Sequence, residues 1–89
     1  MKAVITVVGK DVVGILSKVS TICAEKQVNV IEVTQSILQD MFCMIMIVDV
    51  SNCSTTFPEF ADTLTEYGNE NALSIHVMNE DIFNSMHRI

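Results

Sequence analysis

Hydrophobic and polar residues change their spacing several times along the chain, and each change predicts a new element. Residues 2–9 form a nearly continuous apolar run rich in β-branched side chains, which is typical of a central strand. From Val12 onward the apolar residues recur at helical spacing, and the carboxylate of Asp11 is expected to cap that helix. Residues 30–38 alternate polar and apolar side chains, which indicates an edge strand. Residues 42–50 form a second apolar run and predict another central strand.

The second half of the chain repeats the helix–strand order and adds a tail. Thr56 and Glu59 have the spacing of a capping box, and a proline stands between them in the expected first turn. Gly68 is expected to end this helix as its C-cap. Residues 72–78 predict the last strand and residues 80–89 a short amphipathic helix. The order β-α-β-β-α-β predicts a ferredoxin-like α+β sandwich, in which two helices cover one face of a four-stranded antiparallel sheet.

The other face of such a sheet requires a cover of its own. It is expected to carry alternate residues of the second central strand, with Met44 and Met46 among them. Either the tail helix or a second subunit would cover these side chains, and a homodimer is expected. An apolar content of 49 % in 89 residues points the same way, because a domain of this size buries only about 60 % of its unfolded surface by itself.

Length and composition set further limits. Eighty-nine residues form one domain over 1–89, with a core over 1–79 and a helical tail over 80–89. Five basic and eleven acidic residues give a net charge of −6, which disfavours nucleic acid and anionic membranes as partners. No apolar run approaches the ~18 residues of a membrane span. Three widely spaced cysteines fit neither a disulfide framework nor a CxxC pair, which favours the reducing cytoplasm.

Residues needed for other activities of this fold are missing from the places where they would act. A ferredoxin-like RNA binder needs exposed aromatic and basic residues on its strands, and Phe42 is the one aromatic residue in a strand. A metal chaperone would carry two cysteines in the first loop, and an acylphosphatase-like enzyme an arginine, whereas the single arginine is Arg88. His76 is expected to face outward from the last strand, with a proton-transfer or ligand role as the less favoured alternative. We therefore predict no enzyme, no catalytic residue, no metal and no cofactor.

The stretch from Gly9 to Val30 holds the best candidate for a binding site. A strand ends there in a turn that contains Asp11 and Gly14, and a helix follows. Glycine lets backbone approach a ligand closely, and the first turn of a helix presents unpaired N–H groups. Asp11 and these N–H groups could hold the charged ends of an amino acid, while a second subunit offers the amide of Asn29. In the alternative reading, Asp11 only caps the helix, Gly14 only allows close packing and Asn29 only turns the chain.

The same stretch resembles the ACT domain family, and the resemblance runs over about residues 1–78. The run DVVGILSKV from Asp11 is similar to the family's D-x-P-G-hydrophobic start, with Val13 in place of the usual proline. The run AEKQVNV from Ala24 is similar to the family's A-E-x-x-(V/I)-N-I passage into the second strand. The whole chain looks closest to small bacterial and archaeal proteins that consist of a single ACT domain. Glycine-cleavage repressor-like regulators, which usually carry two such domains, are more distantly similar.

The resemblance implies a partner and a site. ACT domains typically pair side by side into an eight-stranded sheet. They bind effectors, commonly amino acids, between the first loop of one subunit and the second-strand entry of the other. Carried over by position, the ligand-binding residues would be Asp11, Val12, Val13, Gly14, Ile15, Asn29, Val30 and Ile31.

The leading hypothesis is therefore a non-enzymatic, homodimeric regulatory module that binds a small molecule, an amino acid above all. The alternative is a ligand-independent protein–protein interaction module that regulates a metabolic enzyme or a transcription factor. In both cases a separate enzyme or regulator would receive the signal, since no catalytic or DNA-binding domain is recognisable in the sequence.

Overall fold

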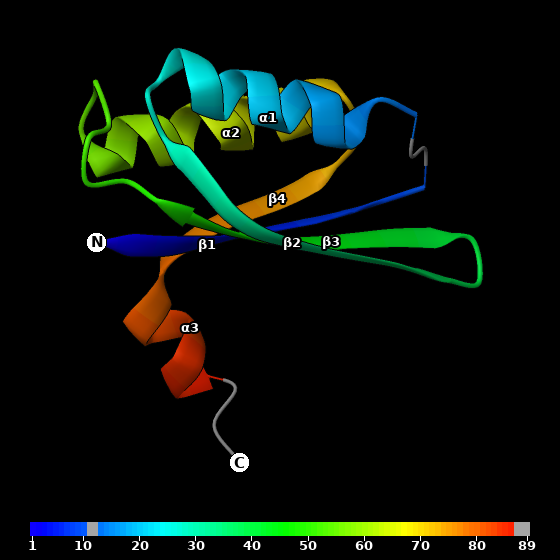
Figure 1. Ribbon diagram of the computed structural model, residues 1–89. Helices are drawn as coiled ribbons and strands as arrows, with labels where there is room; N and C mark the ends of the chain where they lie inside the picture. The colour runs from blue at the N-terminus through cyan, green and yellow to red at the C-terminus, as the bar shows by residue number, and fades with distance from the viewer. Residues whose placement is uncertain (11–12, 87–89) are drawn as a thin grey trace.

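The described residues form four antiparallel strands in one sheet, in the order β2-β3-β1-β4 (Figure 1). The structure is a computed structural model and describes residues 1–10 and 13–86. The two apolar runs form the inner strands and the alternating run forms an edge, as predicted. The strands are β1 (Lys2–Gly9), β2 (Asn29–Leu38), β3 (Met41–Asp49) and β4 (Ser74–Asn79).

Helices flank the sheet on both of its faces. Helices α1 (Ile15–Glu25) and α2 (Phe57–Glu70) lie together on one face, whereas α3 (Glu80–Met86) follows β4 and lies on the other (Figure 1). The element order is that of the predicted ferredoxin-like α+β sandwich with a C-terminal helix, which confirms the expected fold class.

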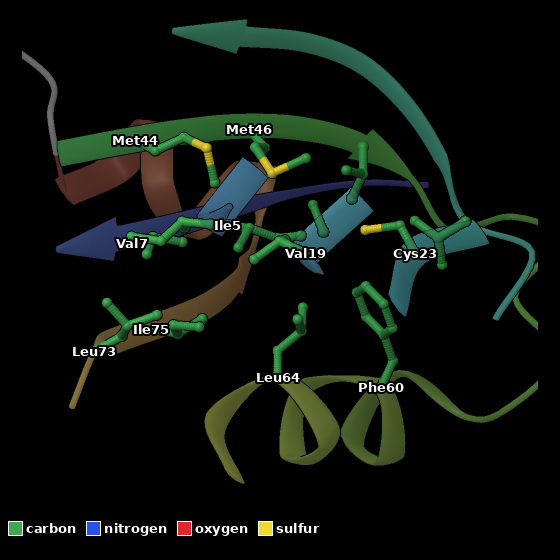
Figure 2. Packing of buried hydrophobic residues seen from close by; sticks show 14 of the residues in the cluster. Ile5, Val7, Val19, Cys23, Met44, Met46, Phe60, Leu64, Leu73 and Ile75 are labelled. Carbon is green, nitrogen blue, oxygen red and sulfur yellow. The ribbon is translucent and has the colours of Figure 1, made fainter. Parts of the chain in front are cut away.

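The hydrophobic core lies between the sheet and the helices α1 and α2. Figure 2 shows Ile5 and Val7 of β1 beside Met44 and Met46 of β3, with side chains of α1 and α2 packed against them. The expectation that Met44 and Met46 lie on the other face is therefore wrong, since both are fully buried under the helices. A continuous apolar run predicts a buried strand but does not tell which alternate set of side chains faces the helices.

The opposite face of the sheet is covered in part by the tail helix of the same subunit. Val4 lies on this face by strand alternation and is only 1 % exposed, because α3 packs against β1 and β4. Farther along the sheet, Ile45 of β3 is 39 % exposed. Helix α3 thus covers one end of this face, while its own Ile82 and Met86 remain exposed.

Helix α1 begins at Ile15, three residues later than its apolar spacing predicts. Its N-cap is Gly14, whose φ of 74° lies in the left-handed region that glycine enters without steric cost. The prediction that the helix starts near Val12 is therefore wrong, while the predicted cap, Asp11, lies with Val12 outside the described residues. A Cβ built on Gly14 would point into open space. Backbone conformation, and not close packing, therefore requires glycine at this position.

Helix α2 starts as predicted but ends later. The Thr56 hydroxyl oxygen accepts a hydrogen bond from the backbone N–H of Glu59 at 3.3 Å, which confirms the N-cap. The prediction of Gly68 as the C-cap is wrong, because the helix continues two residues beyond it. A Cβ on Gly68 would lie 2.9 Å from the carbonyl oxygen of Leu73. This glycine therefore allows the chain that enters β4 to pass close to the helix.

The assignment of the two sheet faces can be tested with neighbouring alanine substitutions. Met44→Ala should lower the free energy of unfolding by about 2–4 kcal/mol, because it empties a fully buried position under the helices. Ile45→Ala acts on the next residue, whose partly exposed side chain lies on the opposite face, and should cost about 1 kcal/mol. Urea unfolding followed by circular dichroism measures both values. An equal or larger cost at Ile45 would contradict the assignment.

The left-handed N-cap of α1 predicts an order of stability among Gly14 variants. Gly14→Ala should lower the free energy of unfolding by about 1–2 kcal/mol, since a Cβ disfavours positive φ. Gly14→Asn should lower it by less, because asparagine enters this region more readily. The same urea titration ranks the variants. An alanine variant as stable as the parent would rule out a positive φ at this residue.

Candidate functional site

The turn after β1 contains one half of the predicted ligand site. Val13 is exposed, Gly14 is the N-cap of α1, and Ile15 begins the helix with its side chain in the core. The other predicted residues of this turn, Asp11 and Val12, lie outside the described part of the chain. Because Ile15 is buried, any contact that it makes with a ligand is limited to its backbone.

The first turn of α1 presents backbone N–H groups next to the open space at Gly14. The carbonyl oxygen of Gly14 accepts the helical hydrogen bond from Lys18 N at 3.0 Å. The N–H groups of Ile15, Leu16 and Ser17 belong to the first turn of the helix, a position where backbone N–H groups generally lack an acceptor within the helix itself. The helix dipole adds partial positive charge at the same end. The arrangement suits a carboxylate or another anionic group.

The other half of the predicted site is the entry to β2. Asn29 is exposed and Val30 is half-buried. Ile31 lies at a β-bulge, where the register with β3 shifts between Val30 and Glu32, and is 47 % exposed. Such an irregularity at an edge strand directs side chains away from the regular alternation. The β2 entry therefore presents an amide and an apolar side chain to solvent.

The sheet register separates these two halves within one subunit. Asn29 pairs with Asp49, which in turn pairs with Lys2 at the start of β1. Gly9 ends β1 at the opposite level of the sheet, where it pairs with Phe42. Seven residues of strand between the two levels correspond to about 23 Å. Figure 1 accordingly shows the end of β1 and the β2 entry at opposite ends of the sheet.

Two cavities flank the turn after β1. The smaller, of about 80 Å³, lies between the turn and the end of α2 and is lined by Val13, Ile15, Tyr67, Asn71 and Leu73. The larger, of about 410 Å³, lies where β1 and β4 separate and is lined by Val8, Gly9, Lys10, Met41, Asn71, Ala72 and Ser74. The sequence reasoning missed Asn71 and Ala72. Ala72 has a φ of 57°, and an alanine gives no sequence signal for such a left-handed turn.

The remaining chemistry of the described residues is sparse. His76 faces outward, as predicted, and its Nε2 lies 3.2 Å from the Ser74 hydroxyl oxygen. Burial, with a smaller contribution from Cys53, raises the pKa of the Cys23 thiol to about 11, so this thiol stays protonated and unreactive at neutral pH. Within residues 1–10 and 13–86 there is no group of three His, Cys, Asp or Glu side chains placed to bind a metal ion. Nor does any helix of that part have the length and apolarity to cross a membrane.

Comparisons with known proteins place this arrangement in a family. Residues 2–78 match the family model of the ACT domain. The chain is 48 % identical to a UPF0237 protein of Clostridium perfringens over 89 residues, which cover 100 % of both chains. An ACT domain protein from Streptococcus pneumoniae has a similar structure, with a TM-score of 0.81, 34 % identity and 93 % of each chain covered. The regulatory subunit of aspartate kinase from Thermus thermophilus shares the fold, with a TM-score of 0.63 at 22 % identity, over 85 % of this chain and 49 % of that chain. The chain therefore belongs to the ACT domain family.

Proposed function

We propose that the protein is a non-enzymatic regulatory module that acts as a homodimer in the cytoplasm and binds a small effector, an amino acid above all. The effector would lie between the first turn of one subunit, residues 11–15, and the β2 entry of the other, residues 29–31. Membership of the ACT domain family supports a regulatory role, and one structural neighbour is named as a regulatory subunit. A separate enzyme or regulator would receive the signal.

The outer edge of β2 is the observation that carries this proposal. β2 is an edge strand ten residues long, and its backbone can pair with a further strand on that side. Its apolar residues Ile31, Ile37 and Leu38 are exposed by 47 %, 68 % and 72 %. A long edge strand with exposed apolar side chains favours association, and strand pairing with a second copy would cover both the backbone and these side chains.

Antiparallel pairing of two β2 strands would unite the separated halves of the site. A twofold axis near the middle of β2 places Asn29 of one copy opposite Leu38 of the other. Leu38 lies one residue beyond Ile37, which is level with Phe42 and thus with Gly9. The partner's Asn29 would therefore come to the same end of the sheet as the turn after β1. The strand register that separates the two halves of the site within one subunit would thus bring them together across an antiparallel β2–β2 interface.

The chemistry of the combined site suits a zwitterion. The N–H groups at the start of α1 would donate hydrogen bonds to the carboxylate of an amino acid. The side chain of Asp11 would pair with its ammonium group, and the amide of the partner's Asn29 could donate to or accept from either group. Val13, Val30 and the bulged Ile31 would contact the effector's side chain. The site contains no nucleophile paired with a general base among the residues the structure describes, so binding without turnover is the expected outcome.

A ligand-independent interaction module is the second candidate. The observation in its favour is apolar surface on the α3 side of the sheet, where Ile45, Ile82 and Met86 are exposed. A regulated enzyme or transcription factor could dock there without any effector. Capture of such a partner by the protein, together with no response to any small molecule, would favour this reading.

The proposal can be tested by oligomeric state and a binding screen. Light scattering should give a dimer in solution. A thermal-shift screen of the twenty amino acids should give a hit, because an effector at 100 times its Kd stabilises the folded state by about 2.7 kcal/mol. A monomer that responds to none of them would contradict the proposal.

Complementation between two variants tests the shared site directly. Gly14→Asn should fill the space beside the N-cap, and Asn29→Ala should remove the partner's amide, so each variant alone should lose effector binding. Mixing the two and re-pairing the subunits should restore roughly a quarter of the sites, since one site of each mixed dimer is intact. Asn52→Ala, an exposed asparagine in another loop, is the matched control and should bind as the parent does. Mixed dimers that fail to recover binding would show that the two residues do not share a site.

A further inference from the structure

We propose that the cavity between the ends of β1 and β4 is a second binding site, which takes a small carboxylic acid with a short apolar body. This β1–β4 cavity is defined by Val8, Gly9, Lys10, Met41, Asn71, Ala72 and Ser74, and its volume is about 410 Å³. Small-molecule sites in proteins typically have volumes of about 300–1,000 Å³. All of its walls come from one subunit, so it differs from the effector site, which needs a partner.

The cavity exists because two paired strands separate at this end of the sheet. β1 and β4 are paired up to Val8 opposite Ser74. Beyond this pair, β1 continues beside β3 to Gly9, while the chain that enters β4 arrives through the left-handed Ala72. A Cβ on Gly9 would collide with the side chain of Leu73. The glycine thus leaves room for the Leu73 side chain, and the cavity opens next to this contact.

Apolar atoms make up most of the cavity wall. Val8 and Met41 point to the same side of the sheet and are both partly exposed, and Ala72 adds a methyl group from the facing loop. A ligand with an apolar body would remove this surface from water. The wall is therefore a better match for a hydrocarbon chain than for a sugar or a nucleotide.

One cation and two polar side chains give the cavity its selectivity. Lys10 is the one charged residue among the described residues that line it, in a chain whose net charge is −6. Within the described part of the chain, no carboxylate lies within 4.0 Å of its ammonium group. Asp40 and Glu70 precede two of the lining residues in sequence but do not line the cavity. A bound anion would give the Lys10 ammonium group a partner of opposite charge.

The polar side chains of the cavity are held in place by neighbouring groups. The Asn71 amide nitrogen donates to the carbonyl oxygen of Tyr67 at 2.8 Å. The Ser74 hydroxyl oxygen lies 3.2 Å from His76 Nε2. If that nitrogen carries its proton and donates it, the Ser74 hydroxyl is left to donate to a ligand. A carboxylate could thus bind between Lys10 and Ser74, with its apolar body against Val8, Met41 and Ala72.

A series of three probes of one shape tests the chemistry of this site. 4-Methylpentanoate, its amide and the corresponding amine differ in charge and share a branched apolar chain. Titration of the full chain, followed by ¹H–¹⁵N NMR, should show shifts centred on Lys10, Ala72 and Ser74. The acid should bind at least about tenfold more tightly than the amide, and the amine more weakly still. Equal affinity of acid and amide, or no binding of the acid at millimolar concentration, would overturn the proposal.

Matched variants test the position of the site. Lys10→Met should weaken binding of the acid about tenfold, whereas Lys2→Met, at the opposite end of the same strand, should leave it unchanged. Ser74→Phe should fill the cavity from an exposed strand position and abolish binding, with spectral dispersion as the check on folding. If this variant does not fold, Lys10→Met alone decides. Undiminished binding to Lys10→Met, or shifts centred on Gly14, would overturn the proposal.

The proposal of the effector site and the proposal of the β1–β4 cavity can be contradicted independently of each other. Asn29→Ala is expected to abolish effector binding at the dimer interface and to leave binding of 4-methylpentanoate unchanged. Loss of 4-methylpentanoate binding in Asn29→Ala would show that the acid occupies the shared site, and would overturn this inference without affecting the proposed function.

Discussion

The alternation of side chains along β1 and β3 is the constraint on which the rest of the structure depends. These inner strands pair without interruption from Lys2 opposite Asp49 to Gly9 opposite Phe42. One alternate set of residues faces α1 and α2 and the other faces α3, so a slip of one residue would exchange the two sets. The same register decides at which end of the sheet the first turn, the β2 entry and the β1–β4 cavity are found.

The order and type of the elements could be predicted from the sequence because their signals are local. Strands and helices differ in the period of their apolar residues, and that period can be read from the amino-acid sequence. The N-cap at Thr56 could also be predicted, because its hydrogen bond to Glu59 spans only three residues. The edge position of β2 followed from its alternating pattern. Each of these features depends on residues that are close in sequence.

The features that could not be predicted depend on backbone conformation or on distant contacts. Met44 and Ile45 are both apolar, and only the helices packed above them decide which is buried. Gly68 resembles a helix C-cap in the sequence, but glycine is needed there because the chain passes close to the helix at Leu73. Turn and helix chemistry indicated Asp11, Gly14 and Asn29 as candidate site residues, and the family resemblance added their neighbours. The separation of these residues within one subunit follows from strand register alone. The β1–β4 cavity could not be predicted from the sequence, because an alanine such as Ala72 does not indicate a positive φ.

The placement of α3 limits how two copies of the chain can meet. The helix packs on β1 and β4 over Val4, so a second sheet could not stack face to face at that end. β2 lies at the edge of the sheet opposite β4 and stays clear of the helix. Lateral extension of the sheet would leave the tail in place, whereas stacking would first require it to detach. Helix α3 thus sterically disfavours face-to-face stacking of two sheets and leaves edge-to-edge pairing possible.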